Sequence, residues 1–217
     1  MQFIFEQIRT GGDRNFAYLI GDREAKVGAI IDPSYDPKAV VDRATAQHLK
    51  VEYVINTHGH PDHTNGNAEA RELTGAPLLA HKTATPAPDV AVDDHQVVEL
   101  GFLKLRFFHV PGHCPDHVVI HLAEQRVALT GDLLFVGKIG GTGNEADART
   151  EYNSLQRILG ELPDETSVWP GHDYGCRPAS TMALEKSTNP FLLAPDLTAF
   201  LDLKQTWSTF KSERGLK

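Results

Sequence analysis

The sequence predicts an α/β protein in which short strands alternate with short helices along the chain. Apolar, β-branched runs recur between segments whose apolar residues repeat at helical spacing, and this favours layered sheets and helices over a helical bundle. The 217 residues are 41% hydrophobic and 23% charged, as in ordinary globular proteins. No linker, charge run or low-complexity segment interrupts them, so we expect residues 1–217 to form a single domain.

The first predicted elements are two adjacent strands and a helix. Residues 15–20 and 27–32 are apolar runs with turn-forming residues between them, which is typical of neighbouring strands. Residues 36–49 then show helical spacing. Asp36 can cap this helix, and Pro37 suits its first turn.

Four later strands each lead to a side chain that can bind a metal. Each is an apolar run followed by Gly or Pro and then by histidine or aspartate. These runs are residues 51–57 before His58-Gly59-His60, residues 103–107 before Pro111-Gly112-His113, residues 126–130 before Gly131-Asp132, and residues 167–169 before Pro170-Gly171-His172. Strand ends are rigid platforms, and ligands of α/β proteins bind where such ends converge. We therefore expect the four ends to build one site.

Three further helices complete the prediction. One covers about residues 64–73 and stops near Gly75. Another covers residues 150–162, where apolar residues repeat at helical spacing. The last lies near the C-terminus, where four apolar residues from Phe200 to Phe210 follow one another at intervals of 3, 4 and 3, so its aromatic side should pack on the body of the protein.

Charge and composition exclude several classes of function. The 21 Lys and Arg against 29 Asp and Glu give a net charge of −8, which argues against nucleic acid as a partner because phosphates require a basic face. No apolar stretch approaches the roughly 18 residues of a membrane span. Two cysteines form no disulfide framework, and no signal peptide is evident, so we expect a cytoplasmic protein. We expect a small-molecule substrate, and a monomer or a homodimer.

The centre of the functional prediction is the segment from Thr57 to His63. Imidazoles and carboxylates suit Zn²⁺, Fe and Mn²⁺, and Gly59 and Pro61 let the loop turn several side chains towards one point. A histidine-rich surface loop is the alternative for this segment alone, and each later His or Asp could be a turn residue. Together the strand ends supply five histidines and two aspartates, enough for two adjacent ions: His58, His60, Asp62, His63, His113, Asp132 and His172.

In residue type and order this set resembles the motifs of the metallo-β-lactamase superfamily. Residues 15–20 and Ile31-Asp32-Pro33 also resemble the opening strands of that family. The resemblance implies a four-layer αββα sandwich, with two mixed sheets inside, helices outside and the metals at one edge of the sheets. It implies a first metal held by His58, His60 and His113, a second held by Asp62, His63 and His172, and Asp132 bridging them.

Two ions held about 3.5–4 Å apart can share a hydroxide, because metal binding lowers the pKa of water from 15.7 towards about 7. Such a hydroxide is a nucleophile at neutral pH, and no catalytic Ser or Cys is needed. Among the ligands we expect Asp62 and Asp132 to take part in catalysis, Asp132 by fixing the distance between the metals. Two divalent ions are expected, Zn²⁺ first, with Fe or Mn²⁺ as alternatives.

Within the superfamily the chain resembles the glyoxalase II branch, whose members hydrolyse hydroxyacyl-glutathione thioesters. The segments that carry the likeness are residues 57–67, 131–135 and 171–174. By this resemblance Tyr174 would contact the substrate. The glycine-rich segment 137–150, read as a loop, should border the substrate too, and in it we expect Lys138 to contact an anion. The family's Lys- and Tyr-bearing glutathione segment is absent after Asp132, which leaves the thiol carrier open.

Two alternatives remain. The chain also resembles the persulfide dioxygenases, which keep the same ligand set but use a single iron. By that resemblance His58, His113 and Asp132 would hold the iron, and the substrate would be glutathione persulfide. The Gly-Arg-Thr-Asp signature of that branch reads Gly-Gly-Thr-Gly at residues 140–143. A metal-binding module without catalysis is the other alternative.

Four further residues near the motifs have supporting or bystander roles in this prediction. Asp32 ends a strand and could accept a hydrogen bond from a ligating imidazole. His117 resembles a residue that supports the site in the family rather than one that binds metal. Cys114 and Cys176 lie close to ligands in the sequence, and we expect both to be bystanders.

Overall fold

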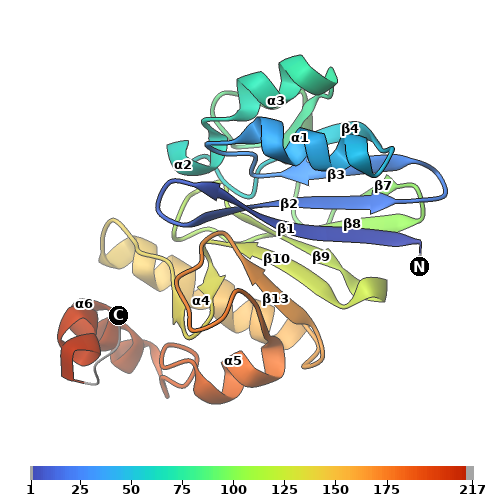
Figure 1. Ribbon diagram of the computed structural model, residues 1–217. Helices are drawn as coiled ribbons and strands as arrows, with labels where there is room; N and C mark the ends of the chain where they lie inside the picture. Colours follow the sequence, from blue (N-terminus) through green and yellow to red (C-terminus); the bar gives the residue numbers. More distant parts are fainter. Residues whose placement is uncertain (1, 214–217) are drawn as a thin grey trace.

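Two six-stranded sheets form the centre of the molecule in the computed structural model, which describes residues 2–213 and, for Lys211, the backbone only (Figure 1). The first sheet has the order β1-β2-β3-β4-β5-β6. Its strands are β1 (Phe3–Gly11), β2 (Asn15–Asp22), β3 (Val27–Ile31), β4 (Lys50–Ile55), β5 (Leu78–His81) and β6 (Val90–Val92). The pairs β1·β2 and β2·β3 are antiparallel, and the pairs from β3 to β6 are parallel. This sheet is therefore mixed.

The second sheet is mixed as well and has the order β14-β13-β10-β9-β8-β7. Its strands are β7 (Val97–Leu100), β8 (Leu103–His109), β9 (Val118–Leu122), β10 (Val127–Gly131), β13 (Ser167–Pro170) and β14 (Ser180–Thr181). Only β10 and β13 pair in parallel. A short hairpin of β11 (Leu134–Phe135) and β12 (Lys138–Ile139) follows β10.

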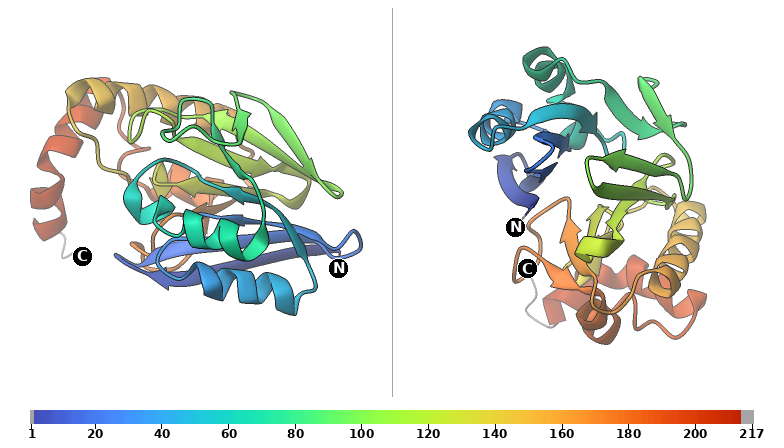
Figure 2. Two further views of the ribbon diagram at one scale, coloured as in Figure 1. Left: turned by 90° about the horizontal axis from the view of Figure 1, so that it is seen from above. Right: turned by 90° about the vertical axis from the view of Figure 1, so that its right-hand side faces the viewer.

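Helices cover the outer face of each sheet, as the views in Figure 2 show. On the first sheet lie α1 (Pro37–Ala46) and α3 (Asn67–Thr74), and α2 (Pro61–Thr64) lies at its edge. On the second sheet lies α4 (Glu145–Glu161); α5 (Met182–Thr188) lies next to β14, and α6 (Leu197–Glu213) packs against α4. A 3₁₀ turn, η1 (Ala123–Gln125), links β9 and β10. The order helix, sheet, sheet, helix is the αββα sandwich that the resemblance stated in the sequence analysis implies.

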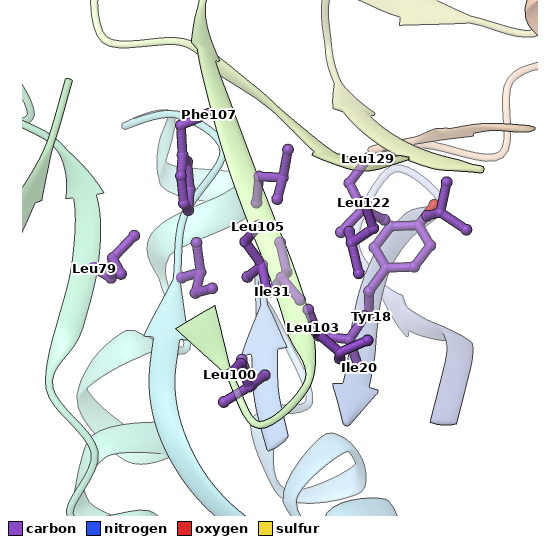
Figure 3. Packing of buried hydrophobic residues seen from close by; sticks show 14 of the residues in the cluster. Tyr18, Ile20, Ile31, Leu79, Leu100, Leu103, Leu105, Phe107, Leu122 and Leu129 are labelled. Carbon is purple, nitrogen blue, oxygen red and sulfur yellow. The ribbon is translucent and has the colours of Figure 1, made fainter. Parts of the chain in front are cut away.

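Alternation along β2 explains how the layers are held together. All its residues are buried. Tyr18 and Ile20 point into the core between the sheets, which Figure 3 shows, whereas Ala17 and Leu19 pack under the helices of the first sheet. Successive side chains of a strand face opposite sides, so a strand buried on both faces is apolar throughout. Truncating a buried leucine such as Leu19 to alanine costs about 2–5 kcal/mol of stability.

The predicted α1 is confirmed, with a shorter C-terminal end. Asp36 caps it by accepting a hydrogen bond from the amide of Ala39 at 3.0 Å, and Pro37 is its first residue. The helix ends at Ala46 rather than at Leu49, because His48 takes the left-handed conformation with φ of 59°.

Two other predicted boundaries were wrong. The prediction placed no strand before residue 15, yet β1 pairs with β2 along its length. Segment 137–150 was read as a loop, but it contains β12, and α4 begins at Glu145. The Asn144 side chain caps α4 by accepting from the amide of Asp147 at 2.9 Å. The first turn after this cap holds no large apolar residue and buries only Ala148, so the spacing of apolar residues does not indicate where the helix begins.

Within residues 2–213, every helix is too short or too polar to serve as a membrane span.

Candidate metal centre

Seven predicted side chains gather where four strand ends meet at one edge of the two sheets. Those after β4, partly on α2, come from the first sheet, and those after β8, β10 and β13 come from the second. In Figure 1 this edge lies at the left, where α2 is. Three groups have ligand atoms within 4.8 Å of one another: His58, His60 and His113; His58, His63 and Asp132; Asp62, His63 and His172. The structure thus brings the seven residues together, and their role as ligands remains a prediction.

Three ring nitrogens face one another in the first group. Nδ1 of His60 lies 3.1 Å from Nε2 of His58 and 2.9 Å from Nε2 of His113. The other ring nitrogens bind outwards: Nδ1 of His113 is 2.7 Å from the carbonyl oxygen of Gly141, and Nδ1 of His58 is 3.1 Å from the hydroxyl of Thr57. A carbonyl can only accept, so His113 donates from Nδ1 and presents a lone pair from Nε2.

The second group repeats this arrangement. Nε2 of His63 lies 3.2 Å from Nε2 of His172. Nδ1 of His63 is 3.1 Å from a carboxylate oxygen of Asp32, and Nδ1 of His172 is 2.9 Å from the carbonyl oxygen of Asp13. Oδ2 of Asp62 completes the group at 3.6 Å from His63 and 3.3 Å from His172. The hydrogen bond predicted for Asp32 is therefore present.

Asp132 lies between the two groups. Its Oδ1 is 3.4 Å from Nε2 of His63, and its Oδ2 is 3.3 Å from His172 and 3.6 Å from His113. Oδ1 is buried and has no hydrogen-bond partner in the described part of the chain. His117 accepts a hydrogen bond from the Asp132 amide at 3.0 Å, so it supports this loop as predicted.

The protonation states suit cation binding. Burial holds the pKa of His58 well below its usual value, and the nearby imidazole of His63 lowers it further. Burial opposes a charge on Asp132, but the imidazoles of His172 and His63 beside it outweigh burial and hold the pKa of this carboxyl well below its usual value. Burial opposes a charge on His63 and His172 as well, but the same carboxylate raises their pKa above the usual value, so a cation at this position takes the place of their protons. Lone pairs and a buried carboxylate converge on one small volume, and this is unfavourable unless a cation balances them. The donor set fits two divalent ions.

Tyr174 and Lys138, both predicted to bind substrate, lie together beside His172. The Tyr174 ring stacks on the His172 ring with centroids 4.6 Å apart, and its hydroxyl donates to the Asp13 carboxylate at 2.6 Å. Nζ of Lys138 lies 3.9 Å from the centre of the Tyr174 ring, and the guanidinium of Arg14 lies 4.8 Å from it. Two cations and an aromatic ring thus form a rim next to the second group.

A cavity of about 780 Å³ lies between α4, α6 and the segment from Lys138 to Asn144, and its lining contains none of the seven candidate ligands. Its lining includes Gly141, whose carbonyl holds His113, and the ring of Trp207. Part of segment 137–150 therefore borders a space that can hold a ligand.

The sequence analysis did not identify two residues that contact the centre, Asn15 and Asp13. Nδ2 of Asn15 donates to the backbone oxygen of Asp62 at 2.9 Å and to its Oδ2 at 3.2 Å. Asn15 is fully buried, and a buried amide requires hydrogen-bond partners. An asparagine at the start of an apolar run could therefore have indicated a residue that binds a polar group of the site. Asp13 holds His172 through its backbone carbonyl. Any residue could supply this carbonyl, so the sequence does not indicate the contact.

The bystander role of the two cysteines stays a prediction. Cys114 is buried and donates to Asp116 at 2.8 Å, and burial, with this carboxylate, raises the pKa of its thiol to about 11. It is therefore a thiol rather than a nucleophilic thiolate at neutral pH. Cys176 is exposed.

Comparison with known proteins places these features in a family. The chain matches the metallo-beta-lactamase superfamily over residues 10–88 and 82–172. It is 34% identical over 167 residues to a hydroxyacylglutathione hydrolase of Pelagibacter ubique, covering 74% of this chain and 67% of that protein. It is 32% identical over 181 residues to the human mitochondrial persulfide dioxygenase ETHE1, covering 82% of this chain and 71% of that one.

A solved structure agrees with the sequence comparisons. The crystal structure of ETHE1 from Myxococcus xanthus superposes with a TM-score of 0.87 at 30% identity, covering 94% of this chain and 91% of that one. The fold, the order of the motifs and these likenesses lead to one conclusion. This chain belongs to the metallo-β-lactamase superfamily.

Proposed function

We propose that this chain is a metal-dependent hydrolase with a two-metal centre that cleaves a small thioester, such as a hydroxyacyl-glutathione. The observation that carries the proposal is the complete double set of ligands with a carboxylate between its halves. A single iron at His58, His113 and Asp132 would leave the other four side chains of the set, His60, Asp62, His63 and His172, without an ion. The likeness to a hydroxyacylglutathione hydrolase supports the same reading.

Each ligand has a defined part in this mechanism. His58, His60 and His113 would hold one ion; Asp62, His63 and His172 would hold the other, and Asp132 would bridge them. Two bound ions would supply hydroxide at neutral pH and polarise the thioester carbonyl. The side chain of Asp62 is 35% exposed, so solvent and substrate can reach this carboxylate, and we assign to it the proton that the attacking water releases.

The rim would bind the rest of the substrate. Lys138 and Arg14 place two positive charges around the Tyr174 ring, next to His172. A carboxylate of the thiol part would be held there by charge, and the ring would support the chain beside it. The leaving thiolate needs no general acid, because thiols ionise near pH 8–9.

A second candidate function is persulfide dioxygenation with one iron at His58, His113 and Asp132. The observation that favours it is the superposition on Myxococcus xanthus ETHE1, which spans nearly the whole of both chains. In this alternative Asp62, His63 and His172 would hold no ion.

Metal content and two assays separate the candidates. The purified protein is loaded with Zn²⁺, Mn²⁺ or Fe²⁺, the bound ions are counted by mass spectrometry, and thioester hydrolysis and oxygen uptake are measured. We expect two ions per chain and hydrolysis of a hydroxyacyl-glutathione. One iron per chain, with oxygen uptake on glutathione persulfide and no hydrolysis, would overturn the proposal in favour of the dioxygenase.

A further inference from the structure

The turn between β1 and β2 contacts the second metal position, which we define as Asp62, His63 and His172. Asn15, the first residue of β2, is fully buried at 0% exposure. Its Nδ2 donates to the backbone oxygen of Asp62 at 2.9 Å and to Oδ2 of Asp62 at 3.2 Å. One amide group therefore fixes both the backbone and the carboxylate of a candidate ligand.

The same turn also holds His172. The carbonyl oxygen of Asp13 accepts from Nδ1 of His172 at 2.9 Å, and Asn15 forms an isolated antiparallel bridge with His172. The amide of Phe16 donates to the carbonyl of Gly171 at 2.8 Å. Two of the three side chains of the second position are thus oriented by the four residues from Asp13 to Phe16.

The first metal position, His58, His60 and His113, is supported from elsewhere. Nδ1 of His113 binds the carbonyl of Gly141, and Nδ1 of His58 binds the hydroxyl of Thr57. Both positions draw ligands from the segment after β4, and Asp32 binds Thr57 as well as His63. The turn itself, however, contacts Asp62 and His172, so a change in it acts directly on the second position.

The chemistry of the Asn15 contact suits a role in metal binding. Oδ2 of Asp62 faces the imidazoles of His63 and His172, and it is also the oxygen to which Asn15 donates. A carboxylate oxygen has two lone pairs, so one can accept the amide proton while the other faces the cation. A neutral donor orients the carboxylate without cancelling the charge that attracts a metal.

The asparagine at position 15 does not give the folded chain its greatest stability. Its Oδ1 is buried without a hydrogen-bond partner in the described residues, and such groups are unfavourable. Gly12 lies against this oxygen, since a Cβ at that position would come within 2.6 Å of it. An apolar residue of similar shape would avoid the unpaired oxygen, but it could not hold Asp62.

We propose that Asn15 is a positioning residue that sets the affinity of the second metal position and leaves the first unchanged. The inference rests on the proposed two-metal function and deepens it. It makes the number of bound ions depend on one amide outside the ligand set.

Asn15→Leu tests the proposal, because leucine keeps the shape of asparagine but cannot donate. Asn15→Ala is a second variant that removes the donor with different packing. Asn189→Leu is a matched control: Asn189 is also 0% exposed, and its Nδ2 donates to a backbone oxygen, of Lys138, and to a carboxylate, of Glu185. Neither acceptor is a candidate ligand.

Zn²⁺ is titrated into each metal-free protein in competition with a chromophoric chelator, and Co²⁺ absorption is recorded for each position. In both Asn15 variants we expect the Kd at the second position to rise about 10–100-fold, the range for residues that orient ligands. The Kd at the first position should stay as in the wild type, and Asn189→Leu should keep both affinities.

Three results would contradict the inference. Equal weakening of both ions in the Asn15 variants, or the same loss in Asn189→Leu, would show a general effect on folding. Two ions bound with unchanged affinity in the Asn15 variants would remove the inference and leave the proposed function standing. A wild type that binds a single ion would remove both.

Discussion

At the scale of single residues, the centre combines ligands that sequence motifs reveal with supports that they do not. Histidines at short spacing after a strand are recognisable because few other structures need them. One contact that orients these rings comes from Asp32, as the sequence analysis predicted. The carbonyls of Asp13 and Gly141, which hold His172 and His113, and the Asn15 amide, which holds Asp62, were not predicted. Every residue has a carbonyl, so the sequence predicts such supports only when the fold is known.

Asp132→Asn should remove most of the hydrolytic activity. The substitution keeps the shape of the side chain but loses the negative charge between the two metal positions. If this charge contributes several kcal/mol, kcat/KM should fall by about 10³-fold or more. Steady-state thioester hydrolysis and metal content are measured together, with Asp164→Asn, an exposed carboxylate paired with Lys186, as the control. Unchanged activity in Asp132→Asn would contradict the bridging role.

Lys138→Met should affect substrate binding rather than chemistry. Lys138 lies over the Tyr174 ring at the rim, away from the ligand atoms. Removing a contact made equally in the bound substrate and in the transition state raises KM and leaves kcat unchanged. We expect a rise in KM of about 10-fold for an anionic thioester and little change for a neutral one. Lys104→Met, on an exposed side chain, should behave as the wild type. A drop in kcat alone would place Lys138 in another role.

At the scale of elements, the sequence predicted β2, β3 and β4 but missed the strands β5 and β9, although every residue of those two is buried. β2 is a largely apolar run that is buried throughout, and β4 buries Val51, Val54 and Ile55. β1 mixes Glu6, Gln7 and Arg9 with apolar residues, since it lies at the edge of the sheet, and this pattern fits a strand less clearly. The start of α4 was hidden for the related reason that its first turn holds no large apolar residue. Mixed or polar composition therefore accounts for the misses at β1 and at the start of α4, but not at β5 and β9.

The contact between α4 and α6 makes stability depend on pH. Glu151 on α4 is fully buried, pairs with Lys204 on α6, and leaves its Oε1 without a partner in the described part of the chain. Burial raises the pKa of Glu151 from 4.5 to about 7, although Lys204 opposes the rise. Between pH 4.5 and about pH 7, Glu151 is ionised in the unfolded chain but keeps its proton in the folded chain. Stability is therefore lost as pH rises through this window and stays lower above pH 7.

Glu151→Gln should remove this dependence. The free energy of unfolding of the variant minus that of the wild type should increase from pH 5 to pH 8, by up to about 3 kcal/mol. Each pH unit within the window contributes about 1.4 kcal/mol to this increase. Urea unfolding of metal-free protein at both pH values measures the difference, and other titrating groups cancel in the comparison. A difference that does not change with pH would show that Glu151 is ionised throughout.

At the scale of the whole molecule, the centre joins two sheets that meet in one apolar core. Four of the seven predicted ligands follow β4 of the first sheet, and three follow β8, β10 and β13 of the second. The sequence could show that these strand ends carry ligands, but not which sheet each strand joins, because pairing depends on contacts far apart in the chain. Only the family resemblance supplied the four-layer arrangement.

Metal removal should therefore lower stability without unfolding the protein. Ions that bind only the folded state add about 4 kcal/mol when their concentration is 1,000 times Kd, which for a chain of this size shifts Tm by roughly 8–16 °C. The three apolar clusters consist of side chains outside the ligand set, so the metal-free protein should still unfold cooperatively. Calorimetry before and after chelation, and after Zn²⁺ is restored, measures the shift. Loss of the folded state on chelation would mean that the ions, rather than the core between the sheets, hold the two halves together.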